Sequence, residues 1–256
     1  MSFVDPGKLE KVKQRKWFYR FDLPDGTSTQ SDVPEHILKI HTSRSHHLRQ
    51  IIQNKVIHSK QMTAIDFACH EGFFSIELAK HFAVVHGFEF RTESLTAARL
   101  ITDLLGVPNV NYVNADLQQM NFKPELGADF VLVFGLIYHM EDPIHVIRLA
   151  SQFSRRYILI ESQVVPYDIS GRVEDGSYEN QRQTEGVFAL VRDYPQAHTG
   201  GSTELALVPS LNALLFLLRE FGFTEIEVLT PDLDDYEQFR RGSRVIVYGE
   251  KKLAHG

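Results

Sequence analysis

Residues 63–79 constrain the fold more than any other part of this chain, because there a buried strand runs into a helix through a tight turn. The apolar run around Ile65 reaches Asp66, and a helical pattern begins at Gly72. The first amides of a helix have no partners within the helix, and the helix dipole favours an anionic group there. The sequence therefore predicts a ligand site where this strand meets its helix.

Acidic residues follow the next two apolar runs as well. Glu89 closes the run at 82–88, and Asp116 comes shortly after the run at 110–113. In an α/β sheet the carboxyl ends of parallel strands meet at one edge, and ligands bind in the crevice there. Together with Asp66, these acids predict a nucleoside held across the edge of the sheet.

Strand and helix patterns alternate through most of the chain. The last turn of the second helix is followed by Gly106 and Pro108, which are stop signals, and Pro143 lies in the first turn of the third helix. The expected strands are 63–67, 83–89, 110–114, 129–134, 157–161, 224–229 and 243–249, and the expected helices are 72–82, 93–105, 143–153 and 210–221. This alternation predicts one α/β domain over residues 61–250.

Two segments fall outside the alternation. Residues 1–60 are expected to form an N-terminal cap on the substrate side, with a strand at 16–23 and a helix at 33–57, whose polar middle at 41–47 leaves a break open. Residues 167–203 have weak periodicity, and an irregular insert of this length is often functional. We expect this insert to act as a lid, with Tyr178 and His198 as candidate lid residues.

Composition limits the class of protein. With 256 residues, the chain is long enough for one substantial domain with additions. Its net charge of −6 argues against non-specific nucleic-acid binding through a basic surface. The single cysteine, Cys69, excludes an internal disulfide and fits a reducing compartment. With no apolar run near the length of about 20 residues that spans a membrane, we expect a cytoplasmic protein without membrane contact, and its oligomeric state stays open.

Two phosphate-binding motifs do not match the turn. A dinucleotide fingerprint would place glycines where the chain has Ala68, His70 and Phe73. No Gly-Lys-Ser/Thr follows a glycine turn either, so a Walker loop is absent. The ligand is therefore expected to be a nucleoside without a pyrophosphate at the turn.

From residue 61 to 250 the chain resembles the class I S-adenosylmethionine-dependent methyltransferases. The resemblance rests on the turn at 66–72, on Glu89 and Asp116, on the segment 134–143 after the fourth strand, and on the closing strand–helix–strand with Phe221-Gly222-Phe223 before the sixth strand. It implies a three-layer, Rossmann-like α/β sheet of seven strands with an antiparallel last strand, and S-adenosyl-L-methionine as cofactor.

The glycine pattern of the turn departs from that family. The usual Asp-x-Gly-x-Gly-x-Gly stands here as Asp66, Ala68, His70 and Gly72. A position in this turn that needs a positive φ falls on His70, and histidine is among the non-glycine residues that visit that region more readily.

The resemblance also assigns the cofactor contacts. Glu89 is expected to accept hydrogen bonds from both ribose hydroxyls, since a carboxylate has two oxygens that accept. Asp116 is expected to face the adenine amino group, with the amide of Leu117 nearby. The turn would follow the methionine part, with Asp66 ordering it. The full expected cofactor set is Asp66, Ala68, Cys69, His70, Gly72, Glu89, Phe90, Asp116, Leu117 and Phe134.

Methyl transfer requires an aligned nucleophile and, for a protic acceptor, a base. His139 follows the fourth strand and is the first candidate for the base or for an acceptor-positioning group; the alternative is a histidine bonded within its own loop. Tyr138 is expected to shape the pocket through its ring face. Glu161 is expected to bind an acceptor hydroxyl or amine, or to order the loop. No metal site is expected, because His46-His47 lacks a convincing set of partners.

A narrower resemblance concerns the segment from Gly135 to His139 with Asp142-Pro143, and Val208-Pro209-Ser210 further on. These residues are similar to the branch that contains the tRNA wobble-uridine carboxymethyltransferases. We nevertheless expect methyl transfer to an oxygen or nitrogen of a small molecule.

Two alternatives to that function stay open. One is methyl or carboxymethyl transfer to RNA, with a positive groove near the pocket involving Arg44, Arg49, Arg172, Arg182 and Arg192. The other is a methyltransferase-like binding protein without catalysis, which the missing glycines would explain.

Overall fold

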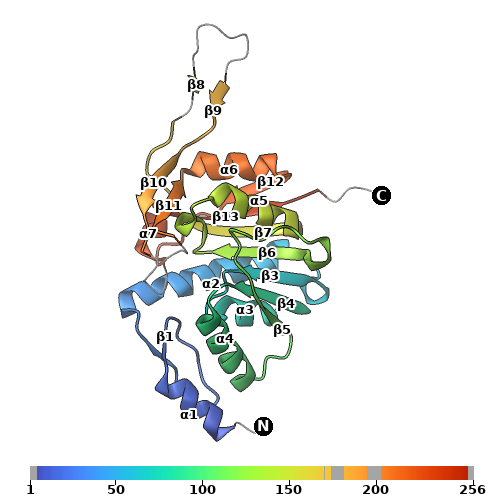
Figure 1. Cartoon of the computed structure of the whole chain (residues 1–256), viewed down its shortest axis with the longest axis vertical. Coiled ribbons are helices and arrows are strands. Elements are labelled where there is room, and N and C mark those ends of the chain that lie inside the picture. Colours follow the sequence, from blue (N-terminus) through green and yellow to red (C-terminus); the bar gives the residue numbers. More distant parts are fainter. Residues whose placement is uncertain (1–4, 170, 174–181, 195–202, 253–256) are drawn as a thin grey trace. The chain divides into compact units, whose positions relative to one another are not determined.

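The computed structural model describes residues 5–169, 171–173, 182–194 and 203–252 (Figure 1). The chain divides into two compact units. The N-terminal unit consists of Met1–Asn121, Ala128–Leu132 and Asp234–Tyr236. The C-terminal unit consists of Phe122–Gly127, Val133–Leu233 and Glu237–Gly256.

The N-terminal unit contains three parallel strands, with the side chains of Ile65, Phe67 and Phe88 buried completely. This burial on both faces explains why the strand at 63–67 reads as a continuous apolar run. The elements of this unit are α1 Pro6–Gln14, β1 Lys16–Trp17, β2 Gln30–Ser31, α2 Glu35–Lys55, η1 Ser59–Gln61, β3 Thr63–Phe67, α3 Phe73–Ala79, β4 Val84–Glu89, α4 Thr92–Leu104 and β5 Val110–Asn114.

The C-terminal unit contains helices that begin at clear caps. The side chain of Asp142 accepts from the amide of His145 at the start of α5, and that of Ser210 accepts from Ala213 at the start of α6. The elements of this unit are η2 Pro124–Leu126, η3 Ile137–His139, α5 Pro143–Phe153, β7 Ser154–Gln163, β8 Gly171–Val173, β9 Arg182–Thr184, β10 Phe188–Arg192, β11 Leu205–Pro209, α6 Leu211–Glu220, β12 Glu225–Val228, α7 Glu237–Arg240 and β13 Arg244–Glu250. Strand β6, Ala128–Phe134, contributes residues to both units.

The main sheet has seven strands in the order β12-β13-β7-β6-β3-β4-β5. Strands β3, β4 and β5 run parallel, whereas β13 is antiparallel to both β12 and β7. The predicted Rossmann-like α/β fold with an antiparallel last strand is therefore confirmed. The predicted bounds of the third strand, 110–114, and of the helix 143–153 match β5 and α5.

The helix predicted at 33–57 is confirmed, and the break that was left open in its middle does not occur, because α2 runs without interruption from Glu35 to Lys55. Its polar middle is buried against residues that are distant in sequence. The Oγ of Ser43 accepts from the amide of Tyr236, and Nε2 of His47 lies 2.7 Å from Oδ2 of Asp235. Partners that are distant in sequence thus form hydrogen bonds with Ser43 and His47, which lie in a polar stretch that is typical of a loop.

The predicted strand at 16–23 is only two residues long. Strand β1 pairs in parallel with β2, and a single bridge joins Asp22 to Ser28. The backbone amides of Phe18 and Tyr19 donate to a carboxylate instead of to another strand. Helix α1 was not predicted, although its signal is present: Asp5 caps the amides of Gly7 and Lys8, and proline follows it directly.

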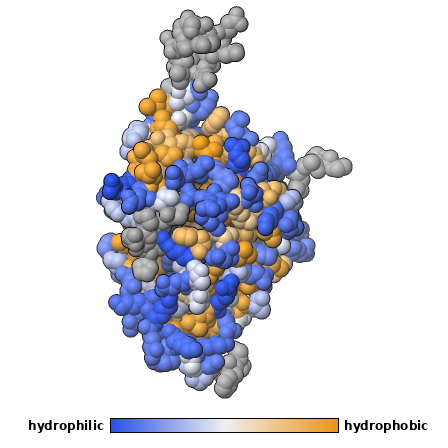
Figure 2. Space-filling view, viewed as in Figure 1, coloured by the Kyte–Doolittle hydropathy of each residue, from blue (hydrophilic) through white to orange (hydrophobic). Residues whose placement is uncertain are grey.

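The insert at 167–203 is more regular in its described part than the sequence predicts. Strand β10 forms a five-pair antiparallel ladder with β11, and β8 pairs with β9. Leu190 of β10 and Leu205 of β11 are 69% and 49% exposed, and Figure 2 shows apolar surface gathering where Figure 1 draws these strands. The candidate lid residues Tyr178 and His198 lie outside the described residues.

Within the described part of the chain, no helix combines the length and the apolar character needed to cross a lipid bilayer.

Candidate cofactor and acceptor sites

The turn that joins β3 to α3 adopts left-handed backbone at alternate positions. The φ angles of Ala68, His70 and Gly72 are +55°, +51° and +81°. These are the positions at which the resembled family has glycine, so the chain makes the same kind of turn with two non-glycine residues. Each of these two costs about 1–2 kcal/mol of backbone strain.

Gly72 is the position in the turn where a side chain has no room. A Cβ added there would lie 2.2 Å from the hydroxyl oxygen of Tyr112 and 3.1 Å from Cβ of Ala98. The turn is closed by two backbone bonds: the amide of Cys69 donates to Phe88, and that of Gly72 donates to Cys69. The side chain of Cys69 is buried.

The carboxylate of Glu89 ties the end of β4 to this turn. Oε2 accepts from the amide of His70 at 3.1 Å, and Oε1 accepts from the amide of Arg91 at 2.8 Å. The side chain is buried, and burial raises the pKa of Glu89 although the backbone amides of Arg91, His70 and Phe90 oppose the shift. A carboxylate has about four acceptor positions, so these bonds do not use all of them, and the ribose contact of Glu89 stays a prediction.

Asp66 connects β3 to α3 from inside the unit. The Oγ of Ser75 donates to Oδ2 of Asp66 at 2.7 Å, and the side chain of Asp66 is 2% exposed. Burial raises the pKa of Asp66 to about 7, with a further contribution from the charge of Glu89. This bond fixes the helix start relative to the strand.

The raised pKa of Asp66 leads to a prediction about stability. In an unfolded chain this carboxyl has its ordinary pKa of 3.8, so the folded state binds the proton more tightly and stability falls as pH rises from about 4 to 7. Asp66→Asn, which still accepts from Ser75, is expected to be more stable than the wild type at pH 8. Its advantage is expected to shrink by about 1 kcal/mol per pH unit between pH 7 and 5. Urea unfolding without cofactor measures this, and an advantage that is independent of pH would contradict it.

The end of β5 is joined to the end of β4 by Asn114, which the sequence analysis missed. Its Nδ2 donates to the carbonyl oxygens of Glu89 and Phe90. An asparagine after a strand is common, so the sequence alone does not predict that Asn114 joins the two strand ends.

The expected adenine-side residues follow at the end of β5. Oδ1 of Asp116 accepts from the amide of Gln118, and Leu117 is buried. Phe90 is 40% exposed, and the guanidinium of Arg91 lies 5.0 Å from its ring centroid.

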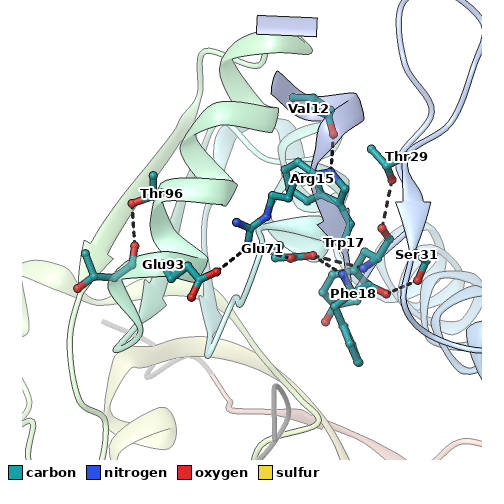
Figure 3. A network of polar contacts seen from close by, with 11 residues as sticks. Val12, Arg15, Trp17, Phe18, Thr29, Ser31, Glu71, Glu93 and Thr96 are labelled. Carbon is teal, nitrogen blue, oxygen red and sulfur yellow. Dashed lines mark hydrogen bonds and ion pairs between the residues drawn. The ribbon is translucent and has the colours of Figure 1, made fainter. Parts of the chain in front are cut away.

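A second carboxylate of the turn, Glu71, holds the N-terminal segment (Figure 3). Its Oε2 accepts from the amides of Phe18 and Tyr19 at 2.9 and 3.3 Å, and its Oε1 lies 3.6 Å from Nη2 of Arg15. Glu71 is buried, and the segment before Phe18 is anchored by Trp17, whose indole donates to the carbonyl of Val12. The rings of Phe18 and Tyr19 lie 5.2 and 5.9 Å from that of His70. Residues 15–19 therefore pack directly against the turn.

In the C-terminal unit, Nδ1 of His139 lies within hydrogen-bond distance of the carboxylate of Asp193. The distances from Nδ1 to the two carboxylate oxygens are 3.2 and 3.1 Å, and the two side chains are 17% and 12% exposed. A carboxylate at Nδ1 favours the proton on that nitrogen and leaves the lone pair on Nε2. Asp193 was missed because it follows β10 in the insert, where no spacing connects it to His139.

Tyr138 and Glu161 are joined through Arg244, which was also missed. Nη1 of Arg244 lies 2.6 Å from Oε1 of Glu161 and donates to the Tyr138 hydroxyl at 3.0 Å. Oε2 of Glu161 accepts from the amide of Gly135 at 2.9 Å. Burial opposes the charged guanidinium, but Glu161 and Tyr138 outweigh it, so the pKa of Arg244 is raised.

The expected residues thus form two clusters. Asp66, Ala68, Cys69, His70, Gly72 and Glu89 lie together in the N-terminal unit, with Phe90, Asp116 and Leu117 at neighbouring strand ends. Tyr138, His139 and Glu161 lie in the C-terminal unit, as does Phe134, which is buried at the end of β6.

Comparison with known proteins identifies the class. A family model described as a methyltransferase domain matches residues 58–203, more than half of the chain. The chain belongs to this methyltransferase family. No curated protein matches it significantly by sequence.

Solved structures agree with the fold. The N-terminal domain of EvdMO1 with SAH bound superposes with a TM-score of 0.73 at 19% identity, covering 98% of both chains. The chain spans 48% of full-length EvdMO1. Magnesium protoporphyrin IX methyltransferase (ChlM) from Synechocystis PCC 6803 with bound SAH gives a TM-score of 0.58 at 14% identity, covering 87% of this chain and 90% of that one. The protein is an S-adenosylmethionine-dependent methyltransferase.

Proposed function

We propose that the chain transfers a methyl group to an oxygen or nitrogen atom of a small-molecule acceptor. The observation that carries this proposal is the contact of His139 with Asp193. Hydroxyl and amine acceptors lose a proton on methylation, so they benefit from a base, and a histidine oriented by a carboxylate is suited to that role. A thiol acceptor ionises more readily than a hydroxyl, so it would depend less on this pair.

In this proposal the N-terminal cluster binds the cofactor. Glu89 accepts from the ribose hydroxyls, Asp116 and the amide of Leu117 face adenine, and the turn at 68–72 follows the methionine part. Phe90 and Phe134 are the proposed apolar contacts. When bound, S-adenosylmethionine supplies a methyl group on a sulfonium, which is already a good leaving group.

The C-terminal cluster receives the acceptor and its proton. Nε2 of His139 accepts the proton of the acceptor as the new bond forms, and Asp193 stabilises the resulting imidazolium. The ring of Tyr138 is proposed to line the acceptor pocket. Its hydroxyl is held by Arg244, which is held in turn by Glu161. Because Arg244 and Gly135 bind both oxygens of Glu161, we assign Glu161 the loop-ordering role rather than contact with the acceptor.

Two structural neighbours support a small acceptor by analogy. The EvdMO1 N-terminal domain was crystallised in the presence of SAH and D-fucose, and ChlM is named for magnesium protoporphyrin IX. We propose a panel of sugars, phenols and amines, assayed with radiolabelled S-adenosylmethionine, with tRNA in parallel. Label transfer to a small hydroxyl or amine compound is expected, and transfer to tRNA alone would overturn the proposal.

The RNA alternative has less support from the residues it needs. Arg44 is buried, so it does not present its charge to a phosphate at the surface. Kinship with the tRNA wobble-uridine branch stays a prediction. Salt-dependent tRNA binding would favour it, and no binding at low salt would remove it.

The binding-protein alternative was motivated by the missing glycines. The missing glycines give this alternative little support, because Ala68 and His70 adopt the left-handed backbone that the turn requires. We keep the cytoplasm as the proposed location, because the single cysteine fits a reducing compartment.

The cofactor assignment predicts that Glu89→Ala weakens SAH binding by more than about tenfold, because two charge-assisted hydrogen bonds are lost. Isothermal titration calorimetry measures this. Glu93→Ala is the matched control, since Glu93 is an exposed carboxylate at the start of α4, and it is expected to bind SAH as the wild type does. An unchanged affinity for Glu89→Ala would show that the ribose binds elsewhere.

A further inference from the structure

The N-terminal unit contains a cavity of about 750 Å³ that the cofactor assignment does not use. Its walls come from residues 20–22, from α2, from α3 and the residue after it, and from the segment that follows α4. Small-molecule sites commonly have volumes of about 300–1,000 Å³. From Glu35 to Arg49 the α2 wall is about 21 Å long at 1.5 Å per residue, so the cavity is a groove along that helix.

The groove has an apolar interior. Phe21, Leu38 and Ile76 are at most 8% exposed, and Phe73 stacks on Tyr19 with ring centroids 4.9 Å apart and planes 8° from parallel. Leu105 and Val107 complete the wall. An apolar ligand body would find a preformed surface here.

Positive charge is in excess at one end of the groove. Glu77 is buried and serves two cations: its Oε1 lies 2.5 Å from Nε of Arg49, and its Oε2 lies 2.7 Å from Nζ of Lys80. Burial would raise the pKa of Glu77, but these partners lower it, so the carboxylate is ionised and offsets only one of the two charges. Lys60, which donates to the carbonyl oxygen of Lys80, adds a further charge.

The other end of the groove is balanced. There Arg20 forms a two-point pair with Glu35, at 3.1 and 2.6 Å, while Lys39 and Asp22 contribute one charge of each sign. The charge of the groove is therefore asymmetric. Its middle is apolar, its Glu35 end is balanced, and net positive charge lies at the Arg49–Lys80 end.

We propose that this groove is a second ligand site, which binds an anionic amphiphile with its acidic head at Arg49 and Lys80 and its apolar body along Ile76, Phe73 and Leu38. One bound molecule of a carboxylate or similar acid with an extended hydrocarbon body fits the length, the wall and the charge. The site is separate from Glu89 and Asp116, so the proposal does not depend on the proposed acceptor.

The test uses the full chain and two probes of equal chain length at submicellar concentration. Sodium laurate is expected to bind saturably in calorimetry with one site per chain, and dodecyltrimethylammonium is expected to bind at least about tenfold more weakly. Equal binding of the two probes, or no laurate binding, would overturn the proposal.

Variants locate the site. Lys80→Glu changes a side chain that is 59% exposed and is expected to weaken laurate binding by about tenfold or more, with SAH affinity unchanged. Lys39→Glu, at the balanced end, is the matched control and is expected to change laurate affinity less than about threefold. Equal effects of the two variants would place the acidic head elsewhere and contradict the proposal.

A vesicle experiment distinguishes a lipid surface from a single bound molecule. Binding of the protein to phosphatidylglycerol vesicles that is lost in Lys80→Glu would indicate a lipid surface as the occupant and would overturn the single-molecule site.

Discussion

Replacing His139 with alanine is expected to lower kcat by about 10²- to 10⁴-fold, the usual contribution of a general base, while SAH affinity stays within about twofold. The physical reason is the contact of Nδ1 with Asp193, which leaves Nε2 to accept a proton from the substrate. Single-turnover rates with the acceptor identified in the panel measure the first quantity, and calorimetry measures the second. The change therefore separates proton transfer from cofactor binding.

Asp193→Asn provides the companion measurement. It keeps the shape of the side chain but removes the charge that stabilises a protonated imidazole, so an intermediate loss of kcat is expected. His145→Ala is the matched control: His145 lies in α5, where its amide is bonded to the Asp142 cap, and its ring has no role in the mechanism. If His139→Ala reduced SAH affinity and left kcat unaltered, His139 would bind the cofactor rather than act as the base.

Replacing Arg244 with methionine is expected to cost about 3–5 kcal/mol of unfolding free energy, because it leaves a buried carboxylate without its cation. Glu161 is completely buried, and Nη1 of Arg244 lies 2.6 Å from it. Urea unfolding at pH 7 measures the loss. Arg156→Met is the control, since Arg156 pairs with Glu250 near the surface and is expected to cost about 1 kcal/mol or less.

A double variant tests the reason for that cost. Arg244→Met with Glu161→Gln removes both charges, so it is expected to be more stable than Arg244→Met alone. If Arg244→Met cost no more than Arg156→Met, the buried pair would not stabilise the loop that carries Tyr138 and His139.

The sequence predicted well those elements whose signals are local. The strand at 110–114 and the helix at 143–153 are bounded by turn residues, a cap and a proline, and the structure has the same bounds. The seven-stranded sheet followed from the alternation of buried strands and helices. His70 was predicted to tolerate a positive φ, and its observed φ is +51°.

The features that were missed depend on partners far away in the sequence. Asp193 acts with His139 across 54 residues, and Arg244 acts with Tyr138 across 106 residues. No spacing rule connects such positions, because the fold alone brings them together. The polar middle of α2 left a break open for the same reason, since the partner of His47, Asp235, is 188 residues away.

The bond between Glu71 and the amides of Phe18 and Tyr19 has a thermodynamic consequence. Residues 15–19 and the turn at 68–72 share one set of hydrogen bonds, so the ordered forms of the two segments favour each other. Coupling of this kind is reciprocal: a ligand that tightens the turn also shifts the N-terminal segment toward its docked form, by the same free energy by which docking improves the affinity for that ligand. A cofactor that binds at this turn as proposed would therefore also stabilise the docked form of the N-terminal segment, although that segment contributes no residue to the proposed binding set.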